Sequence, residues 1–257
     1  MTTEAGPRAP LAPTVAVGIL AGLLSGLFGV GGGILVVPAL ILVLKLDPRR
    51  ASGTSLGAVL PISISSLLTY WSHDNVDWIM AMWLAIGAVM GAVYGTKLIH
   101  VLPRKALGYL FATVLFVTAV RLYIPTDAEG RSEIMWVAAV ALILIGFVTG
   151  VLAGLLGIGG GVVMVPVMIV AFSELPVVAK GTSAAVILPT SIIGTWRNSV
   201  SNNIDHRVAA IVGLAGVPTA ILGGTIADYM SKDVSNALFA TLVLIVAARM
   251  IRDLRSS

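Results

Sequence analysis

The sequence has no cysteine and only three histidines. The lack of cysteine excludes a disulfide framework, a thiolate nucleophile and a thiolate-ligated metal. His73, His100 and His206 lie far apart in the chain, and none stands in the spacing of a zinc motif. Neither a metal site nor a cofactor is therefore expected.

Charge is also scarce. Asp, Glu, Lys and Arg make up 11% of the 257 residues, against about 25% in an ordinary soluble domain, while 58% of the residues are hydrophobic. A soluble chain of this size could not hide so much apolar surface from water. A soluble enzyme, a disordered chain, a coiled coil and a nucleic-acid-binding protein are thus all but excluded. What remains is a membrane protein with several spans, and its long continuous apolar runs favour helices over a barrel.

The apolar runs number eight, and the first is too long for one straight helix. They cover about residues 14–44, 52–71, 78–101, 105–123, 134–172, 182–199, 206–230 and 234–252. The polar stretch at residues 125–133 is the best linker in the chain. The expected organisation is a polar tail, a four-span unit, this linker, a second four-span unit and a short tail: residues 1–13, 14–124, 125–133, 134–252 and 253–257.

The two halves of the chain are copies of one another at an offset of 128 residues. The segment 22–33 matches 150–161, and the match continues without a gap, with about a third of roughly one hundred aligned positions identical. The predicted fold class is all-α integral membrane, with about eight transmembrane helices in two homologous four-helix repeats. An even number of spans per repeat predicts a parallel arrangement, whereas a broken segment that re-enters would allow an inverted one.

Glycine triplets interrupt the first and fifth runs. Three consecutive glycines do not stay in a regular helix, so we expect helices 1 and 5 to be broken at membrane depth. The start of a half-helix offers free N–H groups and the positive end of the helix dipole to an anion. Close helix packing or a simple loop is the alternative. The residues concerned are Gly31, Gly32, Gly33, Gly159, Gly160 and Gly161.

Gly-Thr-Ser segments open the second and sixth runs, and each run then contains a proline. The hydroxyls either cap the helix start or bind an oxyanion together with its N–H groups. The prolines predict kinks and hinges. The hydroxyl residues are Thr54, Ser55, Thr182 and Ser183, and the hinge prolines are Pro38, Pro61, Pro166 and Pro189.

Arg197 is the strongest single candidate for a functional residue in the spans, and Asn198 follows it. The arginine either reaches the membrane interface or acts as a fixed cation that holds a sulfonate, sulfite or carboxylate. Asp77 and Asp205 each start a span, where an aspartate is typical of a helix cap, and proton coupling is the alternative role.

The duplicated G-x-G-G-G-x-x-x-x-P segments, A-x-G-T-S segments and N-x-D turns resemble the TauE/SafE sulfite-exporter-like family, also called the 4-toluenesulfonate uptake permease family. The resemblance covers about residues 14–250. It implies a prokaryotic inner-membrane transporter for small anions such as sulfite, organosulfonates or related carboxylates. The family often has a basic run before V-D-W, whereas residues 70–75 here contain no arginine.

The predicted function is therefore secondary transport of a small anion by alternating access at the repeat interface, with an anion channel as the alternative. No enzyme is expected, because no Ser–His or paired-Asp arrangement lies at membrane depth. The partners expected are the lipid bilayer and the anion, with a homodimer left open and nucleic acid excluded. All five lysines, Lys180 among them, are assigned to loops on one side; the positive-inside rule makes that side cytoplasmic and puts both termini outside.

Overall fold

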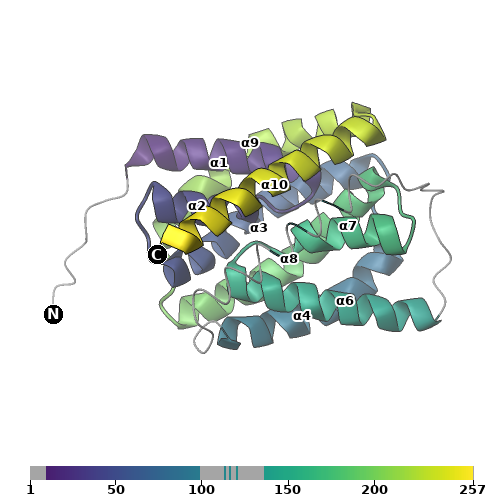
Figure 1. Ribbon diagram of the computed structural model, residues 1–257, viewed down its shortest axis with the longest axis horizontal. Helices are drawn as coiled ribbons and strands as arrows, with labels where there is room; N and C mark the ends of the chain where they lie inside the picture. Colours follow the sequence, from purple (N-terminus) through teal and green to yellow (C-terminus); the bar gives the residue numbers. More distant parts are fainter. Residues whose placement is uncertain (1–9, 99–112, 114–115, 117–119, 121–135, 257) are drawn as a thin grey trace.

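The computed structural model describes residues 10–98, 113, 116, 120 and 136–256 (Figure 1). Within these ranges the chain is helical and forms no strand. The helices are α1 (Leu11–Phe28), α2 (Gly33–Leu42), α3 (Pro48–Ser72), α4 (Trp78–Leu98), α6 (Trp136–Leu156), α7 (Gly161–Ala171), α8 (Pro176–Val200), α9 (His206–Tyr229) and α10 (Lys232–Ser256).

Six of these helices are long and apolar enough to cross a membrane: α1, α3, α4, α6, α8 and α9. Helices α2 and α7 are shorter apolar segments. The all-helical membrane class is thus confirmed for the described residues. The predicted run 105–123 lies outside them except at Thr113, Phe116 and Val120, so the count of eight and the domain boundaries stay predictions.

The helices recur at the offset seen in the sequence. Helices α3 and α8 begin at Pro48 and Pro176, where proline fits because the first N–H of a helix needs no partner. The Gly-Thr-Ser segments therefore lie in the second turn. The expectation that they open their helices is wrong, because the apolar runs start later than the helices do.

Glycines break the first and fifth apolar runs as predicted. Helix α1 ends at Phe28, and α2 starts at Gly33. Between them Gly29, Gly31 and Gly32 have φ of 65°, 74° and 70°, a left-handed conformation that side chains with a Cβ resist. The same conformations recur at the second break, in Gly157, Gly159 and Gly160.

Small residues let the helices of opposite halves approach closely. A Cβ added to Gly18 would lie 2.4 Å from the Val212 carbonyl oxygen, and one on Gly26 would lie 2.2 Å from that of Ala220. The glycines of α1 therefore pack on α9, and those of α4 and α6 pack on one another, as small-residue spacing predicts. The order of these contacts shows that α1 and α9 run in the same direction.

The described helices of the two halves are inverted with respect to one another. In α3 and α8, which are repeat equivalents, Gly53 lies against Asn198, whereas Gly181 lies against Tyr70. Rising numbers in one helix thus meet falling numbers in the other, so the helices are antiparallel. The expected parallel arrangement is wrong.

The broken segments explain the inversion. Helix α3 is parallel to α9, since Gly213 of α9 lies against Ala58 and Gly224 against Thr69, so α1 and α3 also run the same way. Helix α2, which joins them, must lead back toward the end where α1 began. A hairpin that returns to its own side adds no crossing, which is why a repeat that hydropathy divides into four runs can still be inverted. Figure 1 shows α1 beginning and α10 ending at the same end of the bundle.

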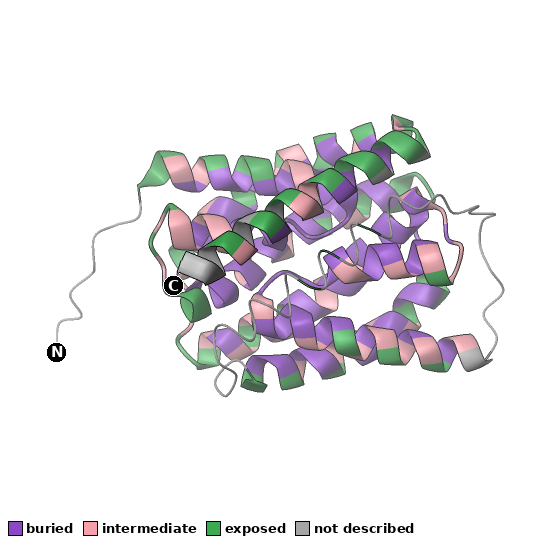
Figure 2. Ribbon diagram, in the orientation of Figure 1, coloured by how far each residue is buried: buried purple, intermediate pink, exposed green. Residues whose placement is uncertain are grey.

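The outer surface of the bundle is apolar. Buried positions gather where helices face one another, while the exposed side of α6 carries Leu144 and Val148 and that of α10 carries Ile245 (Figure 2). Large apolar side chains on the outside are what contact with lipid requires.

Candidate functional site

The two hairpin tips meet in the interior of the bundle. A Cβ added to Gly33 would lie 2.6 Å from the Ile158 Cα, and one on Gly161 would lie 2.8 Å from the Val30 Cα. The predicted glycine triplets, 126 or more residues apart in the sequence, are therefore brought together.

The tips pack on one pair of repeat-equivalent residues, Val59 of α3 and Ile187 of α8. A Cβ on Gly31 would approach Ile187 Cγ2 to 3.1 Å and Val59 Cγ1 to 3.2 Å, and Gly159 faces the same two side chains. Both side chains are fully buried. The tips are therefore next to the contact between the two antiparallel helices.

Helices α2 and α7 begin at these tips without a side-chain cap. Their N-cap residues, Gly32 and Gly160, have no side chain with which to accept a hydrogen bond from the first turn. The first ladder bonds run from Val163 and Met164 N–H to the Gly160 carbonyl, with the equivalent pattern in α2. The N–H groups that precede them point out of the helix start, where the dipole is positive.

Four buried hydroxyls have no hydrogen-bond partner among the described residues, those of Ser55, Ser183, Ser191 and Thr195. Ser55 of α3 and Ser183 of α8 are repeat equivalents, and both are fully buried. Neither Oγ has a hydrogen-bond partner among the described residues. The Ser183 Oγ lies 2.7 Å from the place that a Cβ on Gly161 would occupy, at the start of α7. Because buried hydroxyls are normally paired, two matching exceptions indicate a place where a ligand can bind.

The neighbouring threonines make hydrogen bonds between the two repeats, and their predicted role in substrate binding stays a prediction. Thr54 Oγ1 accepts a hydrogen bond from Asp205 N–H at 2.9 Å, and Thr182 Oγ1 accepts one from Asp77 N–H at 2.9 Å. Each hydroxyl thus holds the turn that starts a helix of the other repeat. The expectation that these hydroxyls cap their own helices is wrong, because those helices already began six residues earlier.

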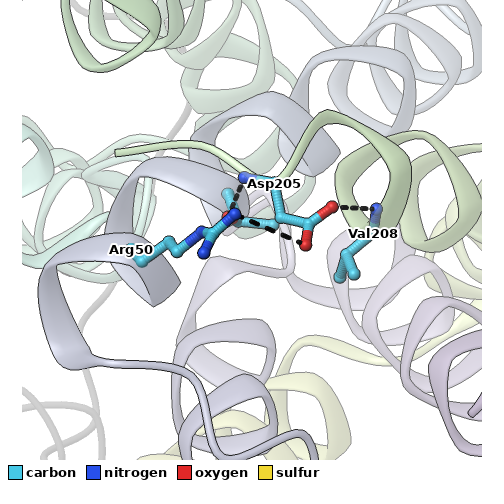
Figure 3. Close-up of polar contacts among 4 residues, drawn as sticks. Arg50, Asp205 and Val208 are labelled. Carbon is cyan, nitrogen blue, oxygen red and sulfur yellow. Dashed lines mark hydrogen bonds and ion pairs between the residues drawn. The ribbon is translucent and has the colours of Figure 1, made fainter. Parts of the chain in front are cut away.

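The two aspartates are helix caps, as one of the two predicted roles required. Asp205 Oδ1 accepts from Val208 N–H at 3.1 Å, and Asp77 Oδ1 accepts from Met80 N–H at 2.9 Å. Figure 3 shows the first cap together with Arg50, whose guanidinium lies 3.9 Å from Asp205 Oδ2. Proton coupling by these aspartates stays a prediction.

Arg197 is not brought to the hairpin tips. It follows Ile187 by ten residues in α8, a distance of about 15 Å along a helix. Its Nε donates to Thr96 Oγ1 of α4 at 2.8 Å, and Asn198 Nδ2 donates to the Gly194 carbonyl of its own helix at 2.8 Å. An anion site that includes Arg197 would therefore be separate from the tips.

The hinge prolines all lie inside helices: Pro38 in α2, Pro61 in α3, Pro166 in α7 and Pro189 in α8. Hydroxyls after Pro61 mainly bond to backbone carbonyls, as Thr69 Oγ1 does to Ser65 O at 3.0 Å. A cavity of about 480 Å³ lies on the outer side of α3 and α9 and is lined by Pro61, Ser65, Thr69 and Ile221 among others.

Lys180 is expected in a loop from the sequence, and its burial is a finding of the structure. Its side chain is 2% exposed, in the first turns of α8 rather than in a loop. Its Nζ donates to Ser235 Oγ and lies 5.9 Å from the ring centroid of Phe28. Pro176 is the signal that could have found it, because a proline at the first helical position places Lys180 inside the helix.

The apolar exterior, the six long apolar helices and the opposed hairpins define a multi-pass membrane protein built from inverted repeats. The chain belongs to the sulfite exporter TauE/SafE family, whose family model matches residues 2–122 and 142–257.

Relatives of this family cover nearly the whole chain. The probable membrane transporter protein YunE of Bacillus subtilis is 29% identical over 256 residues, which cover 90% of this chain and 92% of YunE. The probable membrane transporter protein MJ0441 of Methanocaldococcus jannaschii is 28% identical over 230 residues, covering 85% of this chain and 82% of MJ0441. A probable membrane transporter protein of Xylella fastidiosa strain 9a5c is 46% identical over 85 residues, a third of each chain. No solved structure matches the chain.

Proposed function

We propose that the protein is a secondary transporter for a small anion such as sulfite, an organosulfonate or a related carboxylate. The family and the names of the relatives support transport, and the name of the family supports a sulfur oxyanion. The observation that carries the proposal is the pair of repeat-equivalent buried hydroxyls of Ser55 and Ser183, which have no partner among the described residues and of which Ser183 lies at the start of α7. A bound oxyanion would accept hydrogen bonds from these hydroxyls and from the helix starts.

Alternating access is the mechanism that this symmetry favours. Inverted repeats can exchange conformations, so that rocking about the tips opens a central site first to one side and then to the other. Van der Waals packing of the tips on Val59 and Ile187 would have to change in that motion. The inner-membrane location and the external termini remain part of the proposal; α1 begins and α10 ends at one end of the bundle.

The test is binding and counterflow with the purified protein. Sulfite, thiosulfate, sulfoacetate and acetate would be titrated onto wild type and a Ser55→Ala/Ser183→Ala variant. We expect the variant to fold at least as stably as wild type, since it removes two unsatisfied buried hydroxyls. We also expect its affinity for the anion to fall by a factor of about ten or more. Ser63→Ala is the matched control, because the Ser63 hydroxyl bonds to the Leu60 carbonyl of its own helix.

Proteoliposomes separate the carrier from the channel. Saturable counterflow of the bound anion supports the carrier, whereas unitary currents identify the channel. If none of the four anions binds to wild type, or if the double serine variant binds as wild type does, the proposed site is wrong.

A further inference from the structure

Among the basic residues whose side chains the structure describes, Lys180 is the one that is buried. It lies in a helix long and apolar enough to cross a membrane, where a cation is costly and usually serves a function. The ion pair between Arg50 and Asp205 does not involve Lys180. The ammonium group instead meets a neutral hydroxyl, that of Ser235, and the face of Phe28. Its charge is therefore only partly compensated.

The position of Lys180 connects it to the hairpin tips. Its backbone contacts Gly29, the residue that follows α1, since a Cβ on Gly29 would lie 2.6 Å from the Lys180 Cα. The Gly29 carbonyl oxygen in turn lies 2.8 Å from where a Cβ on Gly161 would be, at the start of α7. Lys180 also precedes Ser183 by three residues, which places both on one face of α8.

The two halves differ at this point. The repeat equivalent of Lys180 is Ser52, whose Oγ donates to the Leu155 carbonyl at 3.5 Å. The second break packs on Ser52 just as the first packs on Lys180. The backbone geometry is thus duplicated, whereas the positive charge is present in one copy only.

We propose that Lys180 is the cation of the anion site and that the site is asymmetric. One small oxyanion binds at the start of α7 and accepts a hydrogen bond from the Ser183 hydroxyl. It also accepts a hydrogen bond from the Lys180 ammonium, which then no longer donates to Ser235. The repeat equivalents of Ser183 and Lys180 are Ser55 and Ser52, a second serine in place of the lysine, so each chain binds one anion. This inference rests on the proposed function, and it identifies Lys180 rather than Arg197 as the charge that the substrate meets.

The test is calorimetric titration of sulfite onto the full-length protein in detergent. We expect one sulfite per chain, and we expect Lys180→Met to weaken its binding about tenfold or more because a charge-assisted hydrogen bond is lost. Lys97→Met is the matched control, since Lys97 is exposed in the last turn of α4, and it should bind as wild type does.

Ser235→Ala keeps the proposal testable if Lys180→Met does not fold. Because the anion would no longer compete with Ser235 for the ammonium, sulfite should bind more tightly than to wild type. Equal or weaker binding by Ser235→Ala, or wild-type binding by a folded Lys180→Met, overturns the role of Lys180 while leaving the proposed function in place. A wild-type protein that binds no anion overturns the proposed function itself.

Discussion

Single hydroxyls join the two repeats. Thr54 and Thr182 each accept a hydrogen bond from the N–H of the aspartate that starts a helix in the other repeat. Thr54→Val keeps the shape of the side chain but leaves the partly buried Asp205 N–H without its partner, at a cost of about 1–3 kcal/mol. We expect this variant to have a lower unfolding temperature in detergent than wild type, with its anion affinity unchanged.

Thr225→Val is the control for this substitution. The Thr225 hydroxyl bonds to the Ile221 carbonyl one turn earlier in its own helix, at the surface, so its removal should leave the unfolding temperature nearly unchanged. If Thr54→Val is as stable as wild type and loses anion binding instead, the hydroxyl belongs to the substrate site and the structural role is wrong.

The residues that could be predicted from the sequence are those whose partners are local. Asp77 and Asp205 cap helices that begin one residue later, so position alone indicated their role. The partner of Thr54 is 151 residues away, and no spacing rule identifies it. The lack of a partner for Ser55 and Ser183 is a property of the packed interior, which a single sequence does not reveal.

At the scale of the helix, the breaks depend on glycine conformation. Gly32 has φ of 70°, and a Cβ there would lie 2.6 Å from the Ala21 carbonyl oxygen. We expect Gly32→Ala to destabilise the protein by more than about 1 kcal/mol, since the left-handed conformation alone costs that much for a residue with a Cβ. The measurement is the unfolding midpoint in detergent, read alongside the size-exclusion profile.

Gly57→Ala is the matched helical control. Gly57 lies within α3, its added Cβ would meet only side-chain carbons, the nearest at 3.2 Å, and alanine is the better helix former. A Gly32→Ala variant as stable as Gly57→Ala would show that the break tolerates ordinary residues.

The sequence predicted where these helices break but not where the chain goes next. Consecutive glycines indicate a break by their conformational freedom, whereas hydropathy gives the length of an apolar run and not its direction. Whether α2 continues α1 or returns beside it depends on packing against α1 and α3. Because of that unpredicted return, the number of membrane crossings in each repeat is odd and not even. An odd number makes the two repeats inverted.

At the scale of the whole molecule, inversion places repeat-equivalent loops on opposite sides of the membrane. His73 follows α3 and Ser201 follows α8, at equivalent positions that are both exposed. Since α3 and α8 are antiparallel, the two residues lie at opposite ends of the bundle.

The natural chain has no cysteine, so His73→Cys and Ser201→Cys each introduce a single thiol into an unreactive background. We expect a membrane-impermeant maleimide added to sealed, oriented vesicles to label one of the two variants, and the other only after the vesicles are opened. Labelling of both from the same side would restore the parallel arrangement and would remove the symmetry on which alternating access about the hairpin tips depends.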